Sequence, residues 1–206
     1  IVFSTLLLPK LSIMVSKGEE SGIRSFLDRT LPQWLLATSV LFIVILLTAR
    51  WALPAIFGPV FGDSVPVLEL LLVASSALAL FNGLVPLISA SGLTWGLSIV
   101  TLMSASSNVL LDFLLIPRFG IVGSACATVL AYSLSAGILI ILVQRRFGHV
   151  RHLPWLIAPV PMVYLIITLV SGPMAYLAGG VCAVASVGVL LRTYGFGKVF
   201  MREGPA

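Results

Sequence analysis

Long apolar runs, separated by short stretches rich in glycine, proline or charge, are the dominant pattern of the sequence. About 20 consecutive apolar residues in a helix can cross the hydrocarbon core of a bilayer, which is about 30 Å thick. The runs therefore predict seven transmembrane spans, at Ile1–Val15, Pro32–Arg50, Val65–Ala90, Trp95–Ile116, Ile121–Val143, Pro154–Val170 and Met174–Leu191. The expected fold is an all-α, polytopic transmembrane helical bundle.

The amino-acid composition supports the same fold. Hydrophobic residues make up 59% of the chain and charged residues only 9%, with a mean hydropathy of +1.15. Because soluble domains contain about 25% charged residues, a soluble fold is excluded. The net charge of +5 does not predict a nucleic-acid partner, since Lys and Arg in a membrane protein gather in the cytoplasmic loops. Membrane lipids are the partners that the composition predicts.

Residues 16–30 carry the densest mixture of charges in the chain. They predict a short amphipathic helix that lies on the cytoplasmic surface of the membrane. Ser16 and Glu19 have the spacing of a capping box, in which each side chain bonds a free backbone N–H group. The apolar face of this helix consists of Ile23, Phe26, Leu27 and Leu31. The alternative for this segment is a solvated loop.

The distribution of Lys and Arg predicts the orientation of the bundle, because these residues resist translocation in short loops. If the loop after the first span is cytoplasmic, ten cations lie inside: Lys10, Lys17, Arg24, Arg29, Arg145, Arg146, Arg151, Arg192, Lys198 and Arg202. Only Arg50 and Arg118 then lie outside. The expected topology is an N-terminal end outside the plasma membrane and a cytoplasmic C-terminus. Since the first apolar run opens in mid-span, the chain is expected to be the C-terminal part of a longer protein.

Residues typical of enzyme active sites are sparse in this sequence. It contains no hydrolase, kinase or metalloenzyme motif, and His149 and His152 lie in a basic loop without a neighbouring carboxylate. Cys126 and Cys182 sit within apolar runs, which is typical of inert buried thiols. The sequence therefore predicts a protein that is not an enzyme, with no catalytic residue, no metal site and no cofactor.

Polar residues within the fourth span are the first candidates for a substrate pathway. Ser104, Asn108 and Asp112 lie four positions apart and therefore share one face of the helix. Polar groups inside a membrane normally face a wet cavity or another helix. The stripe therefore predicts a transport pathway or, equally well, hydrogen bonds between helices. Asp112 is close enough to the outer surface that it is also expected to reach water.

The third and fifth spans carry small residues at positions that predict close helix contacts. Asn82 lies on a small-residue face of the third span, where packing is the main alternative to a role in the pathway. Glu69, one turn into the same span, is expected to reach the outer interface as a carboxylate. Gly120 and Gly123 open the fifth span and are expected to let its backbone approach the fourth span.

The run from Asn108 to Thr128, NVLLDFLLIPRFGIVGSACAT, resembles a segment of the oligosaccharide flippases of polysaccharide biosynthesis. These proteins belong to the multidrug/oligosaccharidyl-lipid/polysaccharide exporter superfamily. The matching positions are Asn108, Ile116, Pro117, Phe119, Gly120, Gly123, Ala125, Ala127 and Thr128. Asp112 stands where the family pattern has a second Asn. Weaker similarities upstream extend the resemblance over about residues 1–150.

The resemblance implies a fourteen-helix transporter with two six-helix lobes and a terminal helix pair. Residues 1–150 would be the C-terminal lobe, residues 151–206 the terminal hairpin and cytoplasmic tail, and a missing N-terminal lobe the partner. The resemblance also implies alternating-access transport of a polyprenyl-diphosphate-linked oligosaccharide to the outer leaflet. Cationic residues are expected to contact the diphosphate, and Arg50 and Arg118 are the candidates on the outer side.

Three other functions are compatible with the sequence. A lipid II flippase shares the implied fold. A multidrug cation antiporter of the same superfamily would be expected to have an acidic residue deep in a helix, which Glu69 and Asp112 are not expected to be. An integral-membrane polysaccharide polymerase or ligase would need a large outer loop with catalytic residues. The longest outer loop here, Ala52–Ser64, contains Asp63 as its one charged residue.

Overall fold

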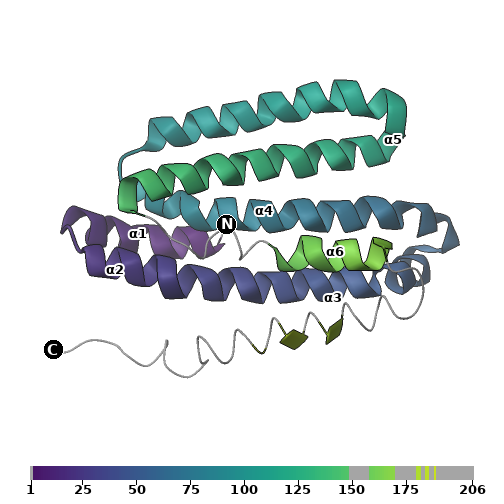
Figure 1. The fold of residues 1–206 in the computed structure, drawn as a ribbon, viewed down its shortest axis with the longest axis horizontal. Coiled ribbons are helices and arrows are strands. Elements are labelled where there is room, and N and C mark those ends of the chain that lie inside the picture. Colours follow the sequence, from purple (N-terminus) through teal and green to yellow (C-terminus); the bar gives the residue numbers. More distant parts are fainter. Residues whose placement is uncertain (1, 149–157, 170–179, 182–183, 186–187, 189–206) are drawn as a thin grey trace.

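The computed structural model describes residues 2–148 and 158–169, together with the isolated positions 180–181, 184–185 and 188. Every element in the two long ranges is helical, as the sequence predicts. In chain order they are α1 (Val2–Ser16), α2 (Glu20–Ser25), the π-helical turn η1 (Phe26–Thr30), α3 (Leu31–Phe57), the 3-10 turn η2 (Pro59–Ser64), α4 (Val65–Ala90), α5 (Thr94–Phe147) and α6 (Pro159–Leu169). The long helices run side by side along one axis (Figure 1).

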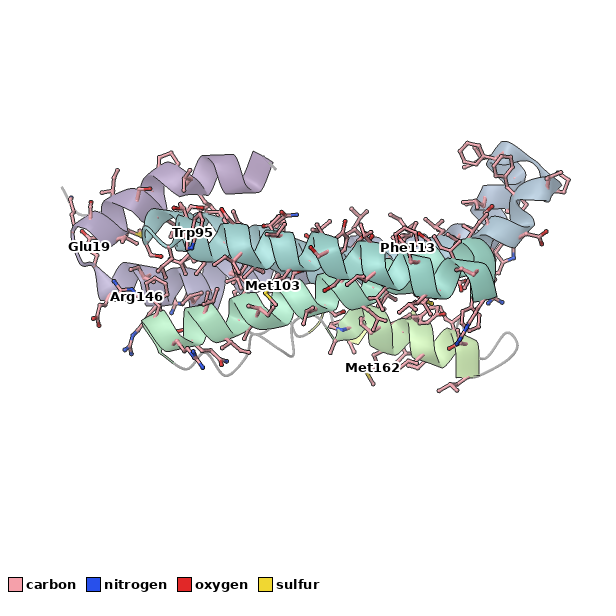
Figure 2. All side chains as sticks on the ribbon, turned by 90° about the horizontal axis from the view of Figure 1, so that it is seen from above. Glu19, Trp95, Met103, Phe113, Arg146 and Met162 are labelled. Carbon is pink, nitrogen blue, oxygen red and sulfur yellow. The ribbon has the colours of Figure 1, made fainter. Side chains whose placement is uncertain are left out.

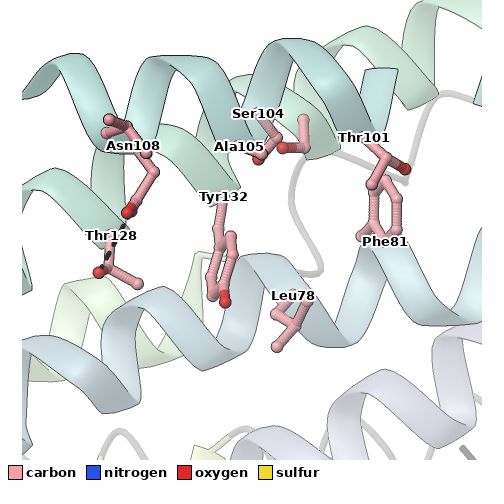
Figure 3. Close-up of a pocket in the computed structure, with 10 residues that line it drawn as sticks. Leu78, Phe81, Thr101, Ser104, Ala105, Asn108, Thr128 and Tyr132 are labelled. Carbon is pink, nitrogen blue, oxygen red and sulfur yellow. Dashed lines mark hydrogen bonds between the residues drawn. The ribbon is translucent and has the colours of Figure 1, made fainter. Parts of the chain in front are cut away.

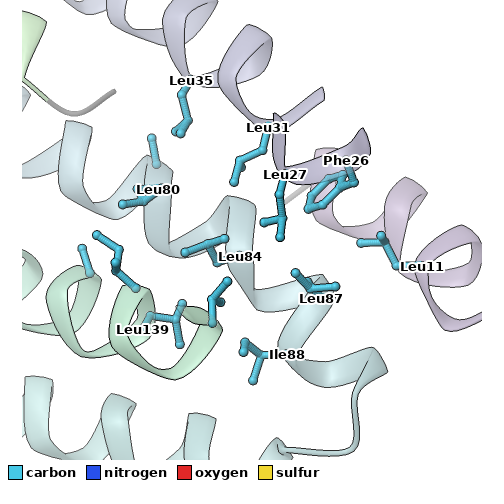
Figure 4. Close-up of a cluster of buried hydrophobic side chains, with 14 of the residues drawn as sticks. Leu11, Phe26, Leu27, Leu31, Leu35, Leu80, Leu84, Leu87, Ile88 and Leu139 are labelled. Atoms are coloured by element: carbon cyan, nitrogen blue, oxygen red, sulfur yellow. The ribbon is translucent and has the colours of Figure 1, made fainter. Parts of the chain in front are cut away.

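Helix α4 is the centre of the bundle, since it contacts α1, α3, α5 and α6. Its apolar side chains, with those of α1, α3 and α5, form the main core, in which Leu80, Leu84 and Leu139 are fully buried (Figure 4). A side chain at Gly83 would collide with Leu31 of α3, so the missing Cβ lets α3 and α4 pack closely. A second, smaller core joins α6 to α3 and α4.

Helix α5 is a hairpin with two long arms, residues 94–119 and residues 121–147, which meet at Gly120. Gly120 has φ 59° and ψ −137°, a backbone conformation that residues with a Cβ adopt only at a cost. Beyond the corner, a Cβ added to Gly123 would collide with the carbonyl oxygen of Leu115 in the first arm. The turn predicted at Pro117–Gly120 is therefore confirmed, and helical backbone continues through Pro117 up to the corner.

Residues 20–57 form one continuous helical rod, whereas the sequence predicted a surface helix followed by a separate span. Ile23, Phe26, Leu27 and Leu31 are at most 6% exposed and belong to the main core, together with Leu11 of α1 and Leu84 of α4. The apolar stripe expected to face the membrane surface thus lies inside the protein. The physical reason is that α1 and α4 supply apolar surface along the same face of the rod.

Within the described residues, three helices are long and apolar enough to cross a membrane: residues 20–57, residues 59–90 and residues 94–147. The third has 54 residues and is about 80 Å long, so its fold at Gly120 gives two crossings of a core about 30 Å thick. Helices α1 and α6 are shorter apolar helices. Most of the predicted span Met174–Leu191 lies outside the described residues. The count of seven spans and the division at residue 150 stay predictions.

Candidate functional site

A cavity of about 430 Å³ opens between α4 and the two arms of α5 (Figure 3). Its wall consists of Leu78 and Phe81 of α4, Thr101, Ser104, Ala105, Asn108 and Val109 of the first arm, and Thr128, Tyr132 and Ser135 of the second arm. Six of these ten residues carry a hydroxyl or amide group and none carries a formal charge. The volume falls within the range of about 300–1,000 Å³ that is typical of small-ligand sites.

Four of the five hydroxyl groups of the cavity wall, all except that of Tyr132, donate their protons in hydrogen bonds to backbone carbonyls that the structure shows. Thr101, Thr128 and Ser135 each donate to the carbonyl oxygen four residues earlier in their own helix, over 2.7 to 3.0 Å. Ser104 Oγ instead donates to the carbonyl oxygen of Ala131 in the other arm, at 3.3 Å. A hydroxyl that donates its proton in this way keeps its lone pairs as acceptors. The wall of the cavity therefore presents mainly hydrogen-bond acceptors.

Two residues of the predicted polar stripe, Ser104 and Asn108, lie in the cavity wall. Asn108 Nδ2 donates to Thr128 Oγ1 at 3.4 Å (Figure 3). Ser104 donates to the backbone of the second arm. The same two side chains thus line a cavity and link the two arms of α5. The two interpretations of the stripe, a pathway and interhelical hydrogen bonds, are compatible in this structure.

Asp112, the third residue of the stripe, lies outside the cavity wall. Its side chain is half-buried, and its Oδ1 is buried with no hydrogen-bond partner among the described residues. An ionised carboxylate oxygen without a partner is unfavourable in such a place. The expected contact with water is therefore wrong for this oxygen. A hydrogen-bond donor from outside the described residues would satisfy this oxygen.

The other predicted pathway and phosphate residues lie apart from the cavity. Asn82 of α4 is half-buried and does not contribute to the cavity wall. Arg118 is exposed and lies two residues before the corner at Gly120. The fold therefore brings Ser104 and Asn108 together and leaves Asp112, Asn82 and Arg118 outside this cavity.

Arg50 and Glu69 form an ion pair between α3 and α4, with 3.2 Å between Arg50 Nε and Glu69 Oε1. Glu69 is only 3% exposed, whereas the side chain of Arg50 is 48% exposed. The prediction of an interfacial, solvent-reaching carboxylate at Glu69 is wrong, because the neighbouring helices cover it and Arg50 neutralises it. The pairing also weakens the case for Arg50 as a phosphate ligand, since its charge already has a partner.

Four polar residues of the cavity, Thr101, Thr128, Tyr132 and Ser135, were not predicted from the sequence as site residues. Their spacing could have indicated a shared polar face, because Thr128, Tyr132 and Ser135 follow one another at four and three residues along one helix. Thr101 likewise extends the Ser104 stripe by one turn. The sequence cannot show that the two faces meet, because this depends on the register of the α5 hairpin.

The arrangement favours reversible binding of neutral polar groups. Acceptor oxygens suit hydroxyl and amide N–H donors, and the cavity wall offers no cation for a phosphate. In the part of the chain that the structure describes, no group of three or more His, Cys, Asp or Glu could hold a metal ion.

Comparison with known proteins identifies the family. The family model described as "Lipid II flippase MurJ" matches residues 1–196 of the 206-residue chain. Searches of the curated proteins and of the solved structures found no match. The family match agrees with the superfamily to which the sequence resemblance pointed, and with the apolar helices of a membrane-embedded protein. The chain belongs to the lipid II flippase MurJ family, which is a family of membrane transporters.

Proposed function

We propose that this protein takes part in flipping a polyprenyl-diphosphate-linked saccharide from the cytoplasmic to the outer leaflet of the plasma membrane, by alternating access. The family match over residues 1–196 carries this proposal. Lipid II, which the family description names, is the preferred substrate. A lipid-linked oligosaccharide for surface polysaccharide is the second candidate, and the resemblance of Asn108–Thr128 to oligosaccharide flippases favours it.

The chain acts, in this proposal, as the C-terminal half of the transporter and closes against an N-terminal lobe. The first arm of α5 supports this arrangement, because its apolar side chains are broadly exposed in the described bundle. Trp95 is 78% exposed, Leu102 68%, Leu110 64% and Phe113 77%. Such a surface requires an apolar environment, which lipid and a second lobe can both provide.

Ser104 and Asn108 are proposed to belong to the substrate pathway, with Asp112 and Asn82 as further members. The acceptor-rich cavity supports this role for Ser104 and Asn108, because saccharide hydroxyl and amide groups are hydrogen-bond donors. Arg118 is a better candidate for a phosphate contact than Arg50, since Glu69 already pairs with Arg50. The cavity would then hold neutral saccharide groups, and the phosphates would bind elsewhere.

The orientation is proposed from the charges at the two ends of the bundle. Lys17, Arg24, Arg29, Arg145 and Arg146 lie toward the end that carries the α1–α2 turn, where Figure 2 labels Glu19 and Arg146. Arg50 and Arg118 are the cations of the described residues toward the opposite end. The positive-inside rule therefore favours a cytoplasmic α1–α2 turn, an outside N-terminal end and a cytoplasmic C-terminus.

Complementation tests the substrate. The full-length gene that encodes this chain is expressed in two bacterial strains, one depleted of its lipid II flippase and one lacking a polysaccharide flippase. We expect restored growth in the first strain. Restored surface polysaccharide in the second strain alone would favour the oligosaccharide. Failure in both strains, with the protein present in the membrane at normal levels, would contradict the proposal.

A drug-susceptibility assay tests the antiporter alternative. The same gene is expressed in a strain that lacks its major drug exporters, and the minimal inhibitory concentrations of lipophilic cations are measured. We expect no change on expression. A several-fold rise would favour cation export over lipid flipping.

A further inference from the structure

Four apolar side chains project from the last turn of α3 and from η2, which follows it. These are Ile56, Phe57, Val60 and Phe61, here called the apolar tip, and they are 71%, 61%, 85% and 47% exposed. The tip lies at the end of the bundle opposite the α1–α2 turn (Figure 1). Exposed apolar surface on this scale normally marks a contact with another apolar phase.

The apolar tip is an ordered structure with defined hydrogen bonds. Gly58, at φ 98°, ends α3, and its N–H donates to the carbonyl oxygen of Pro54 at 2.9 Å. Phe61 N–H then donates to the carbonyl oxygen of Gly58 at 3.1 Å, and the rings of Phe57 and Phe61 lie 5.7 Å apart. The turn thus holds these side chains outward. In water they would remain hydrated, which is unfavourable for apolar side chains.

The length of α3 sets the depth of the tip. Its 27 residues span about 40 Å, whereas a bilayer has a hydrocarbon core of about 30 Å and measures about 40–45 Å with its headgroups. The rod of residues 20–57 becomes apolar after Arg29, and when this apolar part spans the bilayer, Phe57 reaches the headgroup region on the other side. Arg50 lies about 10 Å deeper along the helix, near the acyl-chain boundary. The ion pair with Glu69 suits that depth, because an unpaired charge is costly there.

The composition of the end of α3 and of η2 matches a lipid interface better than water. Residues 51–64 contain three aromatic residues and one charged residue, Asp63. Aromatic side chains concentrate where headgroups meet acyl chains. We propose that the apolar tip is a lipid-binding surface, which inserts at the boundary between headgroups and acyl chains of the leaflet on this side. This inference does not depend on the transported substrate.

Site-directed fluorescence quenching tests the inference. The full chain, with Cys126→Ala and Cys182→Ala, receives a single new cysteine by Val60→Cys or Phe61→Cys and is labelled with bimane. Lys17→Cys, in the exposed turn at the other end, is the matched control. Each labelled protein is reconstituted into vesicles of phosphatidylethanolamine and phosphatidylglycerol. Iodide is the aqueous quencher, and phospholipids with nitroxides at shallow and deep positions are the lipid quenchers.

For both tip positions we expect quenching by iodide to be several-fold weaker than at Lys17, and shallow nitroxides to quench more strongly than deep ones. Iodide quenching equal to that at Lys17 would overturn the inference in favour of a water-facing turn. Protection from iodide and from both nitroxides would also overturn it, because a second protein copy would then cover the tip. Gel filtration checks that each labelled variant is folded. If one tip variant misfolds, the other still tests the inference.

Discussion

The Arg50–Glu69 pair joins two helices through side chains that are unequally buried. Glu69 is 3% exposed, whereas the side chain of Arg50 is 48% exposed. Removing Arg50 leaves a buried carboxylate without its counter-charge. Removing the charge of Glu69 leaves a guanidinium that is still half exposed and can be hydrated. The two halves of the pair are therefore expected to differ in their effect on stability.

We expect Arg50→Ala to lower the free energy of unfolding by about 1–3 kcal/mol, and by more than Glu69→Gln does. The double variant should lose less than the sum of the two single losses, because it no longer contains a buried unpaired charge. Thermal unfolding in detergent measures all three variants. Arg118→Ala, an exposed arginine, is the control and should have little effect. Equal losses for Arg50→Ala and Arg118→Ala would show that the pair does not stabilise the fold.

Asn108 tests whether the cavity has a function beyond packing. Asn108→Ala removes the amide that Asn108 presents to the cavity, and a hydrogen bond between that amide and a substrate group would be worth about 1 kcal/mol, or roughly fivefold in a binding constant. The bond that Asn108 donates to Thr128 is lost as well, but at 3.4 Å it is too long to be strong. We expect transport, measured by complementation at matched protein levels, to fall several-fold while the melting temperature changes little. Ser106→Ala, on an exposed position of the same arm, is the control. Parallel losses of transport and stability in Asn108→Ala would favour a purely structural role.

The capping box that the sequence predicted at the start of the second helix is absent from the structure. Ser16 and Glu19 do not form the expected capping box, because Ser16 Oγ donates to the carbonyl oxygen of Ile13 at 2.9 Å. Helix α2 begins at Glu20, and Glu19 makes no side-chain capping bond. The cause is Gly18, whose φ of 66° ends α1 and turns the chain before α2 starts. A backbone turn thus took the place of the side-chain cap.

Among the elements, the α5 hairpin depends most on a single backbone contact. Gly123 lies against the carbonyl oxygen of Leu115, so Gly123→Ala must push the two arms apart. We expect this variant to lower the melting temperature and to weaken transport, because the cavity wall contains residues from both arms.

Gly137→Ala is the matched control for Gly123→Ala. Gly137 lies in the same arm, and a Cβ there meets no atom within 4 Å. The substitution should be neutral or stabilise the helix by up to about 1 kcal/mol, since Ala favours helices over Gly. Thermal unfolding of the two variants in detergent measures the difference. Equal melting temperatures would mean that the arms separate at no cost.

The rod of residues 20–57 shows why element boundaries were harder to predict than elements. Pro32 predicts a helix start, because proline lacks an N–H and clashes with the carbonyl four residues earlier. The rod nevertheless continues across this position. The π-helical turn η1, in which Leu31 N–H bonds the carbonyl oxygen of Phe26, widens the helix just before Pro32. Nothing in the residue types alone reveals such a turn.

The two ends of the bundle differ in their number of cations, and this difference predicts which end is cytoplasmic. We expect Asp63→Cys, in a cysteine-free background, to react with a membrane-impermeant maleimide added to intact cells. Lys17→Cys should react only after the membrane is opened, since its end of the bundle carries most of the cations. Gel shifts with a maleimide-linked polymer measure both reactions. Labelling of Lys17→Cys in intact cells would contradict the proposed orientation, because it would place this end of the bundle outside.

The sequence by itself determined the membrane environment, the helical class and the turn at Gly120, because these depend on apolar run length and on glycine. It also placed Ser104 and Asn108 on one helix face. Only the tertiary structure decided that this face meets Thr128, Tyr132 and Ser135 across a cavity, and that Glu69 is buried beside Arg50. It also decided that the stripe at Ile23–Leu31 faces the core. The reason is physical: hydropathy shows that a residue avoids water, and only the packing of neighbouring helices decides whether lipid or protein covers it.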